Sequence, residues 1–212
     1  MSLVELITRA DARGLAGSGL ACLDRCVPLL DGDDEVLRPL WAALAGDRVD
    51  AGGQDGEDAR GGDGTDWARE LTRVRERLAG PDADGEDEAV LLARRMLAAA
   101  PDTCSGARIR AWADACSVAS LRIHRLLDPA AEAGGGLGRE NAANGRTENR
   151  TEGLSPLVAA ELRRQIIVLE VLAGHGPAGL RRAVEVSTEG RRVLRAVVSR
   201  RARGRGRPPG RM

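Results

Sequence analysis

Arginines crowd the C-terminal end of this chain, and their chemistry is the clearest that the sequence offers. Residues 199–212 hold six Arg and no Asp or Glu, and all 32 basic residues of the chain are arginine. A guanidinium group stays charged and presents several N–H donors, so it binds phosphate or carboxylate oxygens well. A basic segment without acidic neighbours therefore indicates an anionic partner, most commonly nucleic acid.

The candidate nucleic-acid-binding residues are the arginines of one predicted helix and of the tail after it. They are Arg191, Arg192, Arg195, Arg200, Arg201, Arg203, Arg205, Arg207 and Arg211. Apolar residues recur at helical spacing between Leu180 and Val198, and these arginines lie mainly off that stripe. We expect up to six phosphate contacts, one from each of the arginines after Ser199, which are Arg200, Arg201, Arg203, Arg205, Arg207 and Arg211. An acidic protein partner would use the same residues.

The tail contains Arg205, Gly206, Arg207 and Pro208 in succession. This tetrapeptide resembles the core of an AT-hook. The resemblance implies an extended segment that lies in the narrow minor groove of A·T-rich DNA, where slim glycine fits and arginine is attracted by the negative potential. The alternative is a disordered basic tail that binds phosphates without sequence preference.

Residues 163–201 resemble the helix-turn-helix of winged-helix transcription regulators, through a helix and a Gly-Pro turn in the stretch 168–180. The resemblance implies a second helix near Ala183 and a recognition helix over 193–201 that enters the major groove. The sequence departs from the family pattern because the tight-turn glycine is displaced to Gly190 and no strand pair follows. A plain amphipathic helix that packs on the preceding helix explains the same residues.

Four cysteines and two histidines could in principle bind a metal or act as nucleophiles. Cys22 and Cys26 lie on an apolar helix face with no second close pair downstream, unlike the ligand spacing of zinc sites. We expect the cysteines to be small buried thiols. His124 and His175 have no Ser, Cys or Asp at a spacing that indicates a catalytic triad. The sequence therefore predicts no metal, no cofactor and no enzyme activity.

The net charge of zero hides two opposite halves. Residues 1–100 carry 12 Arg against 21 Asp and Glu, a net of −9, while residues 101–212 carry 20 Arg against 11, a net of +9. Two functions remain open. One is a non-enzymatic regulatory or accessory protein that binds nucleic acid. The other is a protein-protein interaction module or self-associating scaffold, a homo-oligomer held by its opposite halves.

The composition carries no sign of secretion or of membrane insertion. The longest uncharged run in the apolar C-terminal region is 171–180, far short of the about 20 residues that span a bilayer. We expect a cytoplasmic protein with reduced cysteines. The absence of Lys, Phe and Tyr is typical of a GC-rich genome, in which arginine motifs also arise more often by chance.

Helical periodicity in three parts of the chain predicts an all-α protein. The core must be built mainly from Leu, Val and Ala, because Trp41, Trp67 and Trp112 are the only aromatic residues. We expect an irregular bundle of about six to eight helices, with long disordered loops and a disordered basic tail. Pro28 should kink an N-terminal helix or end it early, and Gly190 should weaken or break the last one.

Two Gly-rich polar segments divide the chain, because neither can bury enough apolar area to offset the entropy of ordering it. The prediction is N-terminal helices over 1–45, an acidic linker over 46–65, central helices over 66–127, a Gly/Asn-rich linker over 128–153, a C-terminal helical pair over 154–203 and a basic tail over 204–212. Residues 1–203 are expected to form one helical domain.

Overall fold

The computed structural model describes residues 1–46, 65–80, 87–104, 106–129, 138–148 and 150–205. These residues form nine α-helices and one short 3-10 helix and contain no strand, so the all-α prediction is confirmed. The elements are α1 (Leu3–Arg9), α2 (Ala12–Cys26), η1 (Val27–Leu29), α3 (Arg38–Gly46), α4 (Thr65–Arg77), α5 (Glu88–Ala98), α6 (Gly106–Leu127), α7 (Gly138–Glu148), α8 (Pro156–Gly174) and α9 (Gly176–Arg205).

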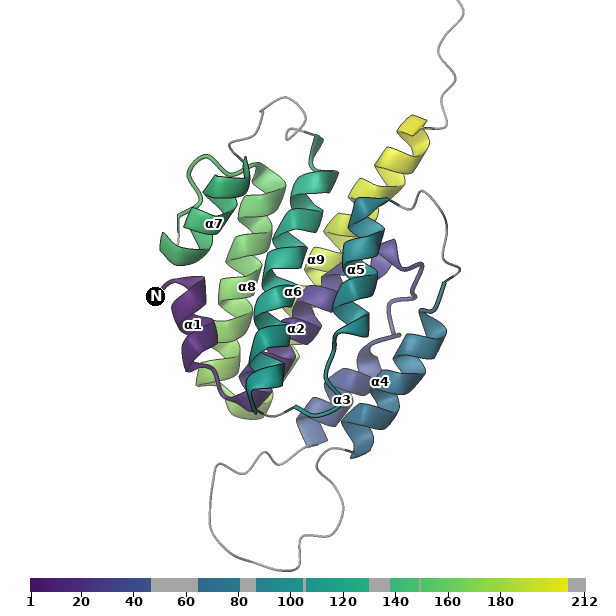
Figure 1. Cartoon of the computed structure of the whole chain (residues 1–212), viewed down its shortest axis with the longest axis vertical. Helices are drawn as coiled ribbons and strands as arrows, with labels where there is room; N and C mark the ends of the chain where they lie inside the picture. Colours follow the sequence, from purple (N-terminus) through teal and green to yellow (C-terminus); the bar gives the residue numbers. More distant parts are fainter. Residues whose placement is uncertain (47–64, 81–86, 105, 130–137, 149, 206–212) are drawn as a thin grey trace, which may run out of the picture.

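Helix α2 is the centre of the bundle, and α6, α8 and α9 pack around it (Figure 1). Every residue of α2 from Gly14 to Cys26 is buried, so this helix has no solvent face. Small residues allow the close approach: a Cβ added at Gly19 would lie 2.5 Å from the ring of Trp112. The helix ends in η1, which contains Pro28, and this confirms the predicted early stop.

The three tryptophans are buried in the core and are its only aromatic side chains, because the sequence contains no Phe or Tyr. Trp67 and Trp112 meet edge to face with ring centroids 6.4 Å apart. Their indole N–H groups donate to the carbonyls of Pro101 (2.8 Å) and Met96 (2.9 Å). Each ring therefore buries its apolar body while its single donor is satisfied, as buried Trp requires.

The predicted C-terminal helical pair is confirmed as α8 and α9, which pack against each other. The expectation that Gly190 could break the second helix in two was wrong, because α9 runs unbroken for 30 residues. A Cβ at Gly190 would lie 2.3 Å from Cδ of Arg25, so glycine is needed here for close approach to α2. The segments near Ala183 and over 193–201 that the winged-helix resemblance separates share this one helix.

The predicted linker over 128–153 was wrong in part, because it contains α7. Helix α7 packs against α1, α6 and α8, and Arg146 on it forms an ion pair with Asp114 of α6. These contacts with distant segments stabilise a helix that has little apolar stripe of its own. The predicted disorder of 47–64, 130–137 and 206–212 lies outside the described residues. None of the described helices has the length and apolar character to cross a bilayer.

Candidate functional site

The predicted arginines of α9 divide into two groups. Those of the first group bond to other residues of the protein. Arg191 is buried, with 6% of its surface exposed, and forms an ion pair with the buried Asp24 of α2. Its Nε also lies 3.2 Å from Oδ1 of Asp34, to which Arg195 donates at 2.7 Å. Arg201 donates to the carbonyl of Leu126 at 2.8 Å.

Arg192, Arg200 and Arg203 form the second group. All three are exposed, and within the described part of the chain none of them takes part in an ion pair. Arg192 and Arg203 are eleven residues apart, so they lie on the same face of α9 about 16 Å from each other. Arg200 precedes Arg203 by about one turn. We call these three residues the exposed arginine face.

The exposed arginine face extends to the C-terminal end of α9, past Arg201, which still bonds Leu126 of α6. Figure 1 shows the C-terminal turns of α9 projecting beyond the other helices. Arg205 is the last residue of α9, and Arg207 and Arg211 of the predicted set lie outside the described residues. The C-terminal end of α9 therefore presents exposed arginines that a large, extended anion can reach.

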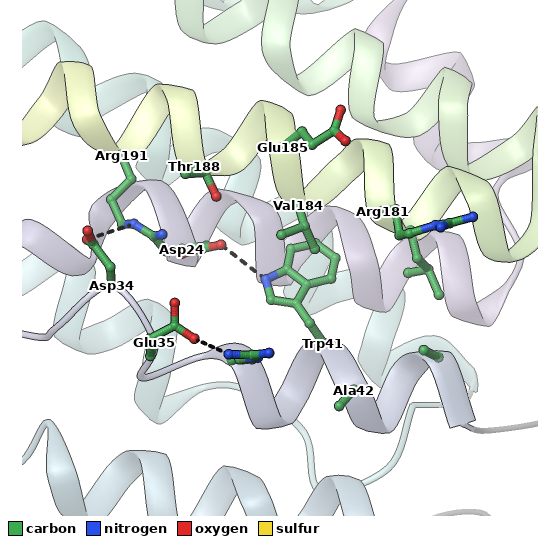
Figure 2. Close-up of a pocket in the computed structure, with 13 residues that line it drawn as sticks. Asp24, Asp34, Glu35, Trp41, Ala42, Arg181, Val184, Glu185, Thr188 and Arg191 are labelled. Carbon is green, nitrogen blue, oxygen red and sulfur yellow. Dashed lines mark hydrogen bonds and ion pairs between the residues drawn. The ribbon is translucent and has the colours of Figure 1, made fainter.

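A cavity of about 470 Å³ lies between α3 and the first half of α9. The ring of Trp41 stands between the two helices, and its Nε1 donates to Oδ2 of Asp24 at 3.1 Å (Figure 2). Asp24 therefore accepts hydrogen bonds from both Trp41 and Arg191, which fixes one end of the cavity. No local pattern in the sequence indicates this site, since Asp24 and Arg191 are 167 residues apart.

A buried polar centre lies where α2, α6 and α8 meet. It consists of Arg25, Ser117, Ser120, His124, Glu161 and Gln165, all of them at most 2% exposed. Arg25 donates two hydrogen bonds to Glu161, at 2.8 and 2.7 Å, and the paired geometry suits a guanidinium and a carboxylate. Ser120 and Gln165 also donate to Oε1 of Glu161, at 2.7 and 2.8 Å. Four donors from three helices thus converge on one carboxylate.

The hydrogen bonds of this centre differ from those of a catalytic triad. In a triad the histidine accepts the proton of the serine, whereas here Ser120 donates to Glu161. His124 instead has Nδ1 2.7 Å from the carbonyl of Ser120, and because a carbonyl only accepts, the imidazole is the donor. Its Nε2 lies 3.5 Å from Glu161. The centre therefore holds three helices together.

Sequence reasoning missed this centre, although a signal was present. Glu161 and Gln165 lie one turn apart on the apolar stripe of α8, and Arg25 lies between Cys22 and Cys26 on a helix with no exposed face. A charged residue within an apolar stripe indicates a buried partner of opposite charge, because an unpaired charge in a core is costly.

The cysteines are placed largely as the sequence predicted. Cys22, Cys26 and Cys116 are buried, Cys104 is half-buried, and none of them forms a disulfide. Burial raises the pKa of Cys22 to about 12, so this thiol stays protonated. Within the described ranges, Cys, His, Asp and Glu side chains do not gather into a group of three that could hold a metal ion. His175 is exposed in the turn between α8 and α9.

The pKa values of Glu161 and His124 in the buried polar centre are both lowered. Burial acts to raise the pKa of Glu161, but the charge of Arg25 and the hydrogen bonds to Glu161 lower it to about 2, from an ordinary value of 4.5. Burial lowers the pKa of His124 below its ordinary 6.5, and the nearby charge of Glu161 only partly opposes this. Both groups bind protons less readily in the folded protein than in the unfolded chain.

Acidification is therefore expected to destabilise the protein in two steps. Stability falls below about pH 6.5, where His124 of the unfolded chain takes up a proton, and again below about pH 4.5, where Glu161 does. The shift of Glu161 corresponds to about 3 kcal/mol, lost as the pH falls toward 2. Urea unfolding at a series of pH values, followed by circular dichroism, measures this.

The matched control is Glu161→Gln, which should flatten the second step and leave the first. Asp24 cannot produce the loss, because burial raises its pKa above 3.8 and so its titration has the opposite sign. A free energy of unfolding that stays constant between pH 5 and pH 3 would contradict the assignment.

Comparison of the chain with protein-family models, with curated proteins and with solved structures found no match in any of the three. Function is therefore inferred from three features of the molecule itself: the exposed arginine face, the cavity between α3 and α9, and the buried polar centre.

Proposed function

We propose that this protein is a non-enzymatic regulatory or accessory protein that binds nucleic acid through the exposed arginine face and the basic tail after it. The observation that carries the proposal is the projecting end of α9, where Arg200 and Arg203 are exposed and residues 199–212 contain no acid. Guanidinium groups in such a position can bind phosphates without first breaking an ion pair within the protein. The tail residues Arg205, Arg207 and Arg211 extend the same charge.

Burial and internal bonds narrow the set of contacting residues. Arg191, Arg195 and Arg201 already bond Asp24, Asp34 and the Leu126 carbonyl. The proposed contacts are therefore made by the remaining members of the predicted set, which are Arg192, Arg200, Arg203, Arg205, Arg207 and Arg211.

The alternative is an interaction module or a scaffold that self-associates through opposite charges. Two of the ion pairs favour nucleic acid over this alternative. Asp24 and Asp34 of the acidic half already pair with Arg191 and Arg195 of the basic half within one chain. These opposite charges are already paired within the chain, whereas a head-to-tail oligomer would need them to pair with a second chain.

Replacing Arg200 and Arg203 with Ala should weaken duplex binding and reduce its salt dependence. Six phosphate contacts give a slope of log K against log salt of about −5, and the double variant should be less steep by about 2. Fluorescence anisotropy of a labelled duplex, titrated at several salt concentrations, measures both slopes.

The matched control is Arg95→Ala with Arg108→Ala, which removes two exposed arginines from α5 and α6 and should leave the slope unchanged. Equal slopes for the two double variants would contradict the proposal. Parallel titrations with A·T-rich and G·C-rich duplexes test the AT-hook resemblance, since only a minor-groove hook prefers the first. No duplex binding, combined with salt-sensitive light scattering, would favour the self-associating scaffold.

A further inference from the structure

The cavity between α3 and α9 has the size and walls of a small-molecule site. Its volume of about 470 Å³ falls within the range of about 300 to 1,000 Å³ that is usual for ligand pockets. Ala42 of α3 and Leu180 and Val184 of α9 supply apolar walls, and Figure 2 shows Val184 above the ring of Trp41. A flat apolar group is the shape that an indole ring and such walls accept best.

Two donors in the cavity wall lack acceptors. The Nε–H of the buried Arg191 makes no hydrogen bond, although Asp34 lies nearby. The hydroxyl of Thr188, one turn earlier on the same face of α9, has no partner among the described residues, and Figure 2 shows it directed from α9 toward Asp24. The Nε–H of Arg191 is buried, and a buried donor without a hydrogen bond is costly, so this end of the cavity favours an oxygen atom of a ligand.

The charge of the cavity wall is positive after its internal pairs are counted. Each of the four carboxylates that line it has its own cation as partner: Asp24 pairs with Arg191, Asp34 with Arg195, Glu35 with Arg38 and Glu185 with Arg182. Arg181 also lines the cavity and takes part in no ion pair within the described part of the chain. The unbalanced charge therefore belongs to Arg181.

Arg181 lies two turns from Thr188, about 10 Å along α9, at the opposite end of the cavity. Figure 2 shows its guanidinium pointing away from Trp41. Because the side chain is exposed, the cation meets a ligand where the ligand's charged group stays partly hydrated. An anionic group at the mouth and an apolar body inside match this arrangement.

We propose that this cavity binds a flat aromatic carboxylate. The aromatic ring lies against the cavity wall formed by Trp41, Ala42 and Val184, the carboxylate meets Arg181 at the mouth, and an oxygen substituent at the far end accepts from Thr188 and Arg191. This proposal is independent of nucleic-acid binding, since it uses the other half of α9.

The test is isothermal titration calorimetry of the full chain with 6-hydroxy-2-naphthoate, which places a carboxylate and a hydroxyl at opposite ends of a flat ring system. The matched probe is the corresponding amide, which has the same shape and no charge. We expect the carboxylate to bind about fivefold more tightly than the amide, the size expected for a charge pair that remains partly exposed.

Arg181→Gln should remove that preference, whereas Arg182→Gln is the matched control. Arg182 is also exposed, but it pairs with Glu185 and does not line the cavity, so its loss should change the dissociation constant less than twofold. Val184→Trp fills the cavity and should abolish binding, with a thermal melt to confirm that the variant folds.

Three results would overturn the proposal. The first is no heat of binding to the wild-type chain at concentrations up to about 5 mM, beyond which an interaction is too weak to be specific. The second is equal affinity for the carboxylate and the amide, or equal effects of Arg181→Gln and Arg182→Gln. The third is binding that survives in a folded Val184→Trp variant, which would place the probe elsewhere.

Discussion

Replacing Glu161 with Ala is expected to lower the free energy of unfolding by about 4 kcal/mol, because it leaves Arg25 charged and unpaired in the core. Arg25 and Glu161 are both fully buried, so water cannot take the place of the lost carboxylate. Ser120 and Gln165 lose an acceptor at the same time. Urea unfolding followed by circular dichroism at pH 7 measures the loss.

The double variant Arg25→Met with Glu161→Met is the control for this interpretation. It removes both charges and keeps much of the volume, so it should recover about 2 kcal/mol relative to Glu161→Ala. Recovery should be incomplete, since Ser120 and Gln165 still lack their acceptor. A double variant less stable than Glu161→Ala would show that the unpaired charge of Arg25 is not the cause of the loss.

Replacing Gly190 with Ala is expected to cost about 3 kcal/mol. In an exposed helix the same change would stabilise by about 1 kcal/mol, because Ala has the higher helix propensity. Here the added Cβ would lie 2.3 Å from Cδ of Arg25, whose guanidinium is held by Glu161 and cannot move aside. Either α9 moves away from α2 or the ion pair is distorted, and both are overpacking costs.

Gly174→Ala is the matched control, because a Cβ at Gly174 would have no atom within 4 Å. We expect that variant to be at least as stable as the wild type. Thermal melts of both variants and the wild-type chain give the comparison. Equal melting temperatures for Gly190→Ala and the wild type would mean that α9 does not press on Arg25 in solution.

Local patterns in the sequence predict the helices that have a start signal or an apolar stripe of their own. Ser155 followed by Pro156 is a local start signal, and α8 begins at Pro156; apolar residues recur at helical spacing from Ile109 to Leu127, within α6. Helix α7 escaped prediction because its stability comes from α1, α6 and α8 rather than from an apolar stripe of its own.

The candidate sites depended still more on contacts between distant parts of the chain. The sequence identified Arg192, Arg200 and Arg203 because exposed charge is a local property. It could not separate them from Arg191, which differs only by meeting Asp24 across 167 residues. Gly190 was misread for the same reason, since its role is set by Arg25 of another helix and not by its own neighbours.

Because α9 is one unbroken helix, a rigid movement of its first half also moves its C-terminal end. Its 30 residues span about 45 Å, with the cavity wall at one end and the projecting arginines at the other. Gly190 lies near the middle of the helix, where α9 packs most closely against Arg25, and we take it as the pivot of a rigid tilt. A tilt of about 5° about this point moves Arg203, 13 residues further on, by about 2 Å. A change in the spacing between α3 and the first half of α9 would therefore also shift the arginines at the C-terminal end of the same helix.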